Sequence, residues 1–391
     1  MELYPAMQSA SITKFERFLF YCLFGIFFAV NTQYTSSALN LLRWILLISF
    51  FFYHGVRQGI RMTVISRSGI IWFLFMILPK FPTMIANTYM LSRAFSYILL
   101  ILGFHICMNK PSPGGIREKI YFNWLANILI IGCLISFPFL FIGNGYLGGR
   151  FRGIMTNANG CALITVFAVI CAIYKMKTTP HRIRYFAICV AFFVMIVLTQ
   201  SRMAFVLAVI VFMTIPFLLG SNKSMSRRVS QVILILFFAM LVYFVLTQSS
   251  WGVLERLESL EAKRDIWDYA YPRIRQSPIV GHGYSYSAYQ RELNPYDESW
   301  ATHSSYLELL VDCGYYGFLC GAMLFITSIG TSLKNFWKDN LVLFLALAIG
   351  IGLLMGFSES FLFATGNPIS VCFWFFMAIL VNYRRHSGST I

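Results

Sequence analysis

Long apolar runs recur along the whole chain, and they restrict the fold more than any other feature. Of the 391 residues, 58% are hydrophobic and 12% are charged, whereas a soluble domain is about 45–50% apolar with about 25% charge. One or two globular cores cannot bury this excess. A secretory signal would give a single short run, and barrel strands would alternate apolar and polar residues. The sequence therefore predicts an all-α polytopic membrane protein, and it excludes a soluble enzyme and an outer-membrane barrel.

Stretches of about 20 apolar residues can span a bilayer as helices, and they predict roughly twelve spans here. The expected centres are Ile26, Ser49, Leu74, Leu99, Leu129, Phe167, Phe192, Val209, Ala239, Phe318, Gly350 and Phe375. We expect helices one to nine within residues 1–247. An outer cap loop then covers residues 248–302, and residues 303–391 hold helices ten to twelve and a short tail.

Basic residues gather in alternate loops. These residues are Lys14 and Arg17; Arg57, Arg61 and Arg67; Lys110, Arg117 and Lys119; Lys175, Lys177, Arg182 and Arg184; Lys223, Arg227 and Arg228; Lys334 and Lys338; and Arg384 and Arg385. Loops rich in Lys and Arg stay in the cytoplasm, so both termini are predicted to be cytoplasmic. This topology explains most of the formal net charge of +16 and leaves no reason to expect a nucleic-acid partner.

The remaining cations face away from the cytoplasm and need another explanation. They are Arg43, Lys80, Arg93, Arg150, Arg152, Arg202, Arg256, Lys263, Arg264, Arg273, Arg275 and Arg291. An arginine on that side or within the membrane is expected to meet an anionic substrate or a carboxylate partner.

The loop from Gln248 to Ala301 holds more than half of the 15 acidic residues and is predicted to form a structured cap. Its first half has helical spacing, with apolar residues at Val253, Leu257, Leu260, Trp267, Tyr271 and Ile274. Continuing the spacing from Leu260 leads to Arg264, which places a cation on the stripe expected to be buried. Such a cation requires a partner, either a cap acid in a salt bridge or a bound anion. Pro272 is expected to kink or restart this helix.

His303 lies at the N-terminus of an expected helix that opens at Thr302, at the outer membrane boundary. A helix N-terminus favours a neutral imidazole, which can accept a proton; the alternative is hydrogen bonding at the interface. The nine cysteines form no Cys-x-x-Cys pair and are interpreted as small buried hydrophobes, so no metal or cofactor is expected.

Four segments together resemble the superfamily of O-antigen ligases and O-antigen polymerases of bacterial membranes. They are Arg150 to Asn159 (RFRGIMTNAN); Leu198 to Arg202 (LTQSR), expected as a tight outer turn; Lys263 to Trp267 (KRDIW) with Pro278 to Gly283 (PIVGHG); and His303-Ser304 followed after nine residues by Gly314, and then by Gly317. The resemblance implies a C-type glycosyltransferase fold in the cell inner membrane. It also implies transfer of a glycan from undecaprenyl diphosphate to a saccharide hydroxyl at the periplasmic face, without a metal, in lipopolysaccharide or related polysaccharide biosynthesis.

The resemblance also assigns roles to residues. Arg202 and Arg264 would bind the donor diphosphate and stabilise its departure, and His303 would accept or orient the proton of the attacking hydroxyl. Arg150 and Arg152 are further candidates for the diphosphate, or for pairing with a cap acid, and Arg150 is preferred because it stands three residues before Gly153. The aromatic residues of the cap either stack on sugars or pack the cap; the candidate sugar contacts are Tyr284, Trp300, Tyr306 and, more weakly, His282.

The sequence leaves several functions open. A polymerase would extend a lipid-linked repeat, with a chain-length regulator as a candidate partner, whereas a ligase would place the polymer on the lipid A core. We favour the polymerase because that branch is more numerous. A secondary transporter is a third alternative, because Glu308 and Asp312 lie one helical turn apart in the tenth span. A lipid-linked glycan flippase is a fourth, although its cations would be spread through the membrane depth.

Overall fold

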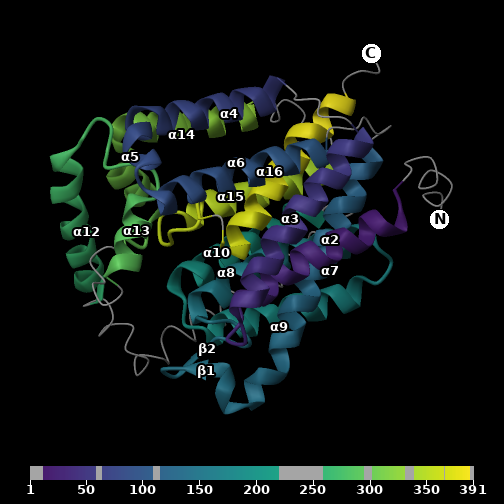
Figure 1. The fold of residues 1–391 in the computed structure, drawn as a ribbon. Coiled ribbons are helices and arrows are strands. Elements are labelled where there is room, and N and C mark those ends of the chain that lie inside the picture. Colours follow the sequence, from purple (N-terminus) through teal and green to yellow (C-terminus); the bar gives the residue numbers. More distant parts are fainter. Residues whose placement is uncertain are drawn as a thin grey trace.

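A computed structural model describes residues 12–58, 64–108, 115–219, 259–294, 302–330, 339–364 and 366–387. The described part is almost entirely helical (Figure 1). The helices are α2 (Lys14–Ala29), α3 (Ser37–Gln58), α4 (Val64–Ile77), α5 (Phe81–Ile85), α6 (Thr88–Met108), α7 (Ile116–Ser136), α8 (Ala158–Thr178), α9 (Arg182–Leu198), α10 (Arg202–Leu219), α12 (Ser259–Gln276), α13 (Tyr286–Leu293), α14 (Ser305–Gly330), α15 (Asn340–Met355) and α16 (Pro368–Ser387). Strands β1 (Tyr146–Leu147) and β2 (Arg150–Phe151) form a short antiparallel hairpin.

Several helices have the length and composition of membrane spans. Five of the described helices are long and apolar enough to cross a bilayer, and four shorter apolar helices accompany them. Every expected centre except Ala239 lies in a helix, and Ala239 lies outside the described residues. The all-α architecture is therefore confirmed, while the number of spans and the C-type glycosyltransferase fold stay predictions.

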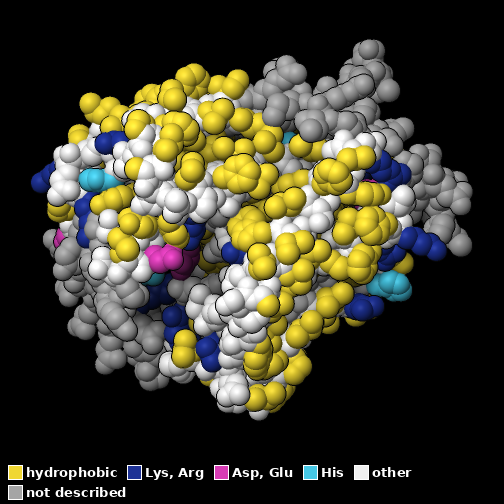
Figure 2. Space-filling model, in the orientation of Figure 1, with side chains coloured by type: hydrophobic (Ala, Val, Ile, Leu, Met, Phe, Trp, Pro, Cys, Tyr) yellow, Lys and Arg dark blue, Asp and Glu magenta, His cyan; other side chains and the backbone are white. Residues whose placement is uncertain are grey.

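Helix α8 forms the centre of the bundle. Within its apolar window 89% of the residues are buried, against 17% for α3, and α8 packs against α7, α9, α10 and α15. Helix α3 instead presents large apolar side chains outward, among them Ile45, Ile48 and Phe52. Figure 2 shows hydrophobic side chains over the flank of the bundle, as expected of a surface that faces lipid.

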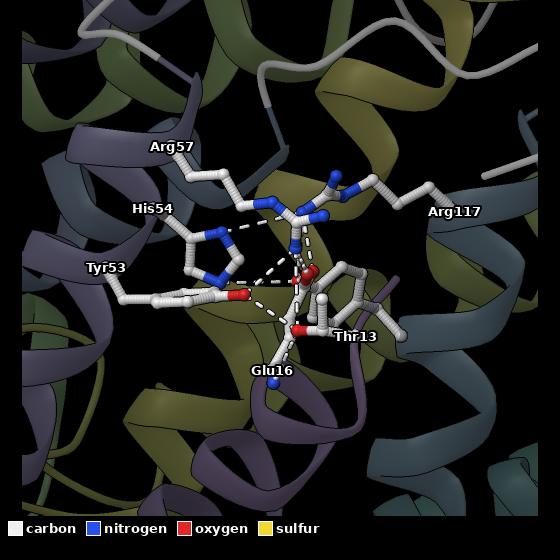
Figure 3. Close-up of polar contacts among 7 residues, drawn as sticks. Thr13, Glu16, Tyr53, His54, Arg57 and Arg117 are labelled. Atoms are coloured by element: carbon white, nitrogen blue, oxygen red, sulfur yellow. Dashed lines mark hydrogen bonds and ion pairs between the residues drawn. The ribbon is translucent and has the colours of Figure 1, made fainter. Parts of the chain in front are cut away.

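One end of the bundle is joined by a buried ionic cluster (Figure 3). Glu16 at the start of α2 is fully buried, and its two carboxylate oxygens accept from Arg117 of α7 at 2.6 Å and from Arg57 of α3 at 3.1 Å. Tyr121 also donates to Glu16, and the His54 ring lies 3.5 Å from Arg117 Nη2. The cluster holds together three helix ends that were predicted to be cytoplasmic.

The start of α2 and the end of α16 lie at this same end, opposite α12, α13 and the β1–β2 hairpin (Figure 1). Asp339, just before α15, accepts a hydrogen bond from Tyr383 of α16 and pairs with Lys119 of α7. The segments predicted to share one face of the membrane are therefore neighbours in space, while their cytoplasmic location stays a prediction.

The described part of the cap, α12 and α13, packs on α14. Ala270 and Ile274 of α12 are buried against Val311 of α14. Trp267 and Tyr271 of the predicted apolar stripe are 40% and 47% exposed, so the helical core does not cover them, and their burial against the bilayer stays a prediction. The buried face is the narrow one that contains Ala270, whose small side chain allows α12 to approach α14 closely.

Two further expectations for the cap can be compared with the structure. Helix α12 does not restart at Pro272 but continues to Gln276. A proline near the end of a helix removes one backbone hydrogen bond, and the packing of Ile274 keeps the last turn in place. Val253 and Leu257 lie outside the described residues, as does the side chain of Arg264.

Helix α14 is interrupted at Gly314, whose φ and ψ are 65° and −169°. A broken helix leaves backbone groups without partners, which is tolerated at membrane depth only where protein or water satisfies them. Here the turn after α12 supplies the partners. The hydrogen bonds run from Tyr315 N to Pro278 O (2.8 Å), from Tyr316 N to Ile279 O (3.0 Å), from His282 N to Val311 O (3.1 Å) and from Gly283 N to Asp312 O (2.6 Å).

Two glycines allow this close approach. Gly281 has φ +64°, and a Cβ added there would lie 2.4 Å from the carbonyl carbon and oxygen of Asp312. Gly314 has φ +65°, and a Cβ there would lie 2.4 Å from Ile279 O. Gly281 and Gly314 come from two separate sequence motifs, and they lie on the two sides of one backbone contact.

Replacing Gly314 with alanine is expected to destabilise the protein by at least about 2 kcal/mol, because this backbone conformation strongly favours glycine and the new methyl would overlap Ile279 O. Thermal unfolding in detergent measures the effect. Gly350→Ala is the matched control, since a Cβ at Gly350 meets nothing within 4 Å in the middle of α15. Equal stability of the two variants would show that the backbone contact is not required.

Candidate functional site

Arg150 connects three segments at one end of the bundle. It lies in β2, and its Nε donates to Thr199 O at 2.9 Å while its Nη2 donates to Asn159 Oδ1. Thr199 belongs to the turn between α9 and α10, and Asn159 lies in the first turn of α8. The predicted turn from Leu198 to Arg202 is confirmed, because α9 ends and α10 begins at these two residues.

The segment after Arg150 is held tightly by backbone contacts. The N–H groups of Arg152 and Gly153 both donate to Gly145 O, at 2.8 and 3.1 Å. Gly153 has φ +57°, and a Cβ there would lie 2.6 Å from Ser136 Cβ. Asn157 then caps α8 by accepting from Gly160 N at 2.6 Å. The positive φ and the close contact with Ser136 explain why a glycine stands three residues after Arg150.

Asn159 extends the connection to the loop between α15 and α16. Its Nδ2 donates to Glu359 Oε1 at 2.8 Å. The Ser305 hydroxyl, at the first residue of α14, donates to Glu359 O at 2.7 Å and accepts from the N–H groups of Phe361 and Leu362. The start of α14 is therefore fixed to the same loop that holds Arg150 through Asn159.

His303 and Arg202 lie at the two ends of this network. His303 directly precedes Ser304 and Ser305, has φ 46° and is exposed. Arg202 is the first residue of α10, is exposed, and follows Thr199 by one turn. Within the described residues neither side chain has a hydrogen bond or an ion pair. Helix α14 begins at Ser305, three residues after the expected start at Thr302. The reason is that the hydroxyl of Ser304, and not that of Thr302, accepts the hydrogen bond from Leu307 N in the first turn.

The other residues singled out in the sequence take varied positions. Arg152 is half-buried with an unpartnered Nε, and the side chain of Arg264 lies outside the described part of α12. Trp300 lies outside the described residues. His282 is placed between α12 and α13, where its Nε2 lies 3.0 Å from Arg273 O and its ring stacks on Tyr286.

Two of the candidate sugar contacts are engaged with the protein. The Tyr284 hydroxyl donates to Phe363 O at 3.0 Å, and burial raises the pKa of this phenol well above its usual value, so it stays protonated. Tyr306 donates to Leu353 O at 2.7 Å and packs on Phe357.

The acidic pair of α14 is used to hold α13. Glu308 pairs with Arg291 at 2.6 Å, and Asp312 Oδ1 accepts from the N–H and the hydroxyl of Ser287 at 2.8 and 2.6 Å. In the part of the chain that the structure describes, no group of three or more His, Cys, Asp and Glu side chains is arranged to hold a metal ion.

Sequence reasoning did not identify Glu359 and Asn159 as site residues. Asn159 stands in a recognised motif, and Glu359 is one of few acids in the apolar helical regions. The rarity of such acids is the signal that could have found Glu359, since a membrane acid marks a pairing or a functional position.

Most described helices are apolar, the broken helix α14 is bridged by the cap, and a polar network lies at one end of the bundle. These features define a polytopic membrane protein with a candidate site at that end. Residues 187–322 match the family model described as O-Antigen ligase, so this part of the chain carries a domain of that family. The matched range contains Arg202, Arg264, His303 and both Gly281 and Gly314. The comparison with curated proteins gives no match.

Proposed function

We propose that this protein is a membrane glycosyltransferase that moves a glycan from undecaprenyl diphosphate to a saccharide hydroxyl at the periplasmic face of the bacterial inner membrane. The O-antigen ligase family domain supports this class of reaction. The observation that carries the proposal is the network from Thr199 through Arg150, Asn159 and Glu359 to Ser305, because it joins the surroundings of Arg202 to those of His303.

Arg202 and Arg264 are the proposed diphosphate ligands. Guanidinium groups bind phosphate oxygens in bidentate fashion, and Arg202 has no protein anion as partner among the described residues. As the bond from the anomeric carbon to the diphosphate breaks, these cations balance the charge that stays on the leaving group, a role that metal ions fill in many phosphate-leaving reactions.

His303 is the proposed proton acceptor. The acceptor hydroxyl oxygen attacks the anomeric carbon, its proton passes to the imidazole, and undecaprenyl diphosphate leaves from the opposite face with inversion of the anomeric centre. An exposed imidazole beside a helix start suits this role, since it is reachable by a hydroxyl. Arg150 is proposed to position the turn before Arg202, because its hydrogen bonds to Thr199 O and Asn159 are internal.

Transfer is favoured over transport by the positions of the acids in α14. A secondary transporter is an alternative function because of Glu308 and Asp312, but both side chains are bound to α13 of the cap. Carboxylates that carry ions across a membrane face the transport pathway, whereas these two fasten one element to another. Their pairing therefore supports a fixed cap over a reaction site.

The proposal is tested by complementing a deletion strain with Arg202→Gln or His303→Asn and displaying its surface polysaccharide on gels, with membrane abundance measured in parallel. We expect normal abundance and no restored polymer. A single repeat on the core identifies a polymerase, which we favour, and bare core with lipid-linked polymer identifies a ligase. Normal polymer from both variants would contradict the proposal and reopen transport.

A further inference from the structure

Two arginines that the proposed reaction does not use face one cavity. Arg43 of α3 and Arg93 of α6 were among the cations predicted to lie away from the cytoplasm. Between them lies a cavity of about 380 Å³, whose other lining side chains include Trp44, Ile48, Phe95 and Leu99. The cavity thus combines two cations with an apolar wall.

Both guanidinium groups are held in place without an acid. Arg43 donates to Gly366 O at 3.2 Å and lies 5.1 Å from the centre of the Trp44 ring, and its Nε is buried without a partner. Arg93 donates to the Tyr89 hydroxyl at 2.7 Å and lies over that ring. Within the described residues neither arginine forms an ion pair, in contrast to Arg291.

The two positive charges line the same cavity. Like charges in a partly buried site repel, and they are stabilised when an anion lies between them. A nearby acid, Glu292, interacts with Tyr89, but no carboxylate among the described residues lies within ion-pairing distance of Arg43 or Arg93. The charge pattern therefore fits an anionic ligand with more than one acceptor oxygen.

The apolar wall identifies that ligand as a lipid. Ile48 and Phe95 are 52% and 60% exposed on the outer flanks of α3 and α6, where the membrane would lie. Arg43 and Arg93 stand six and five residues from the helix starts, which is roughly 8–9 Å along the axis. The phosphate headgroup of a lipid at that level would contact the two arginines. The tail of the same lipid, lying between the helices, would contact the apolar wall.

The cavity shares Arg93 with a second chamber that reaches the start of α14. Arg93 also lines an inner chamber together with Ser305, Ser360 and Arg291. Gly366, whose carbonyl oxygen accepts from Arg43, lies in the same loop as Glu359 and also accepts from Asn31. Figure 2 shows acidic and basic side chains beside a hollow in this half of the molecule. Arg93 is therefore the residue through which a headgroup in the cavity would lie next to the chamber at the start of α14.

We infer that the groove between α3 and α6 binds an isoprenoid diphosphate lipid, with Arg43 and Arg93 on the phosphates and the isoprenoid along Ile48, Phe95 and Leu99. This inference rests on the proposed function for the identity of the lipid. The site is separate from the one proposed at Arg202 and Arg264. Two lipid diphosphate sites suit a polymerase, whose donor and acceptor are both lipid-linked, better than a ligase.

Photocrosslinking of the purified full chain in vesicles tests the inference. A Phe95→benzoylphenylalanine variant is illuminated with labelled undecaprenyl diphosphate. The crosslink is expected to form and to fall at least about tenfold when Arg43→Gln and Arg93→Gln are added, because two charge-assisted contacts are lost. Arg17→Gln is the matched control, since Arg17 also lies over a tyrosine ring but on α2, and it should leave the crosslink unchanged.

Competitors separate a lipid from a free anion. Excess inorganic diphosphate should compete weakly, and unlabelled undecaprenyl diphosphate should compete fully. A crosslink that is absent, that ignores the two arginine changes, or that inorganic diphosphate removes as well as the lipid does would overturn the inference. Arg202→Gln should keep the crosslink while abolishing transfer, so failure of the groove and failure of the proposed reaction give different results.

Discussion

Replacing His303 with asparagine is expected to lower glycan transfer by about 10²–10⁴-fold, the range for loss of a general base. Asparagine is the informative substitution because His303 has φ 46°, and asparagine tolerates that region where alanine is strained. Within the described residues the ring has no hydrogen bond or ion pair, so the fold should not depend on it. Transfer rate per molecule of membrane-embedded protein is the measurement.

The control for this variant is His181→Asn. His181 is also exposed and also precedes a helix, α9, but at the opposite end of the bundle. Its replacement should leave transfer unchanged. If His303→Asn transfers glycan as fast as His181→Asn, the imidazole at position 303 is not the proton acceptor.

Replacing Glu16 with glutamine is expected to destabilise the protein by about 3–5 kcal/mol, the range for breaking a buried ion pair by removing one partner. Arg117 is 3% exposed and would lose the carboxylate that balances its charge. The loss separates the ends of α2, α3 and α7 (Figure 3). Thermal unfolding in detergent, followed by the fraction that stays monodisperse, measures the effect.

Lys119→Ala is the comparison for Glu16→Gln. Lys119 and Asp339 form a pair of 3.9 Å at the same end, but their side chains are 38% and 32% exposed. Partly exposed pairs contribute about 0–1 kcal/mol, so this variant should unfold close to the unchanged protein. A Glu16→Gln variant as stable as Lys119→Ala would mean that the buried cluster does not hold the helix ends together.

The helices were predictable because apolar length and loop charge are local properties of a sequence. Helices centred near Phe167 and Gly350 were predicted from apolar length alone, and the neighbouring positions of Lys119 and Asp339 agree with the predicted grouping of basic loops. The tight turn before Arg202 was found from its motif. In each case the signal lies within a few tens of consecutive residues.

Contacts between distant segments were not predictable from one sequence. Nothing local indicates that Gly281 faces Asp312, or that Asn159 binds Glu359 across 200 positions. The part that Ala270 plays in packing α12 on α14 was not predicted for the same reason, since its partner Val311 is distant in the sequence. The break in α14 at Gly314 likewise depends on a contact with a distant segment. The glycine in this apolar helix is a local signal, but it does not by itself predict the break.

The central claim is that the protein breaks the bond between a glycan and a lipid diphosphate. Its most direct test is the release of undecaprenyl diphosphate from a lipid-linked repeat unit by the purified chain in vesicles, measured together with the glycan product. The account predicts equal amounts of released lipid and newly formed glycosidic bonds, with neither formed by His303→Asn or Arg202→Gln. Movement of intact lipid-linked repeat across the vesicle membrane, with no undecaprenyl diphosphate released, would contradict it.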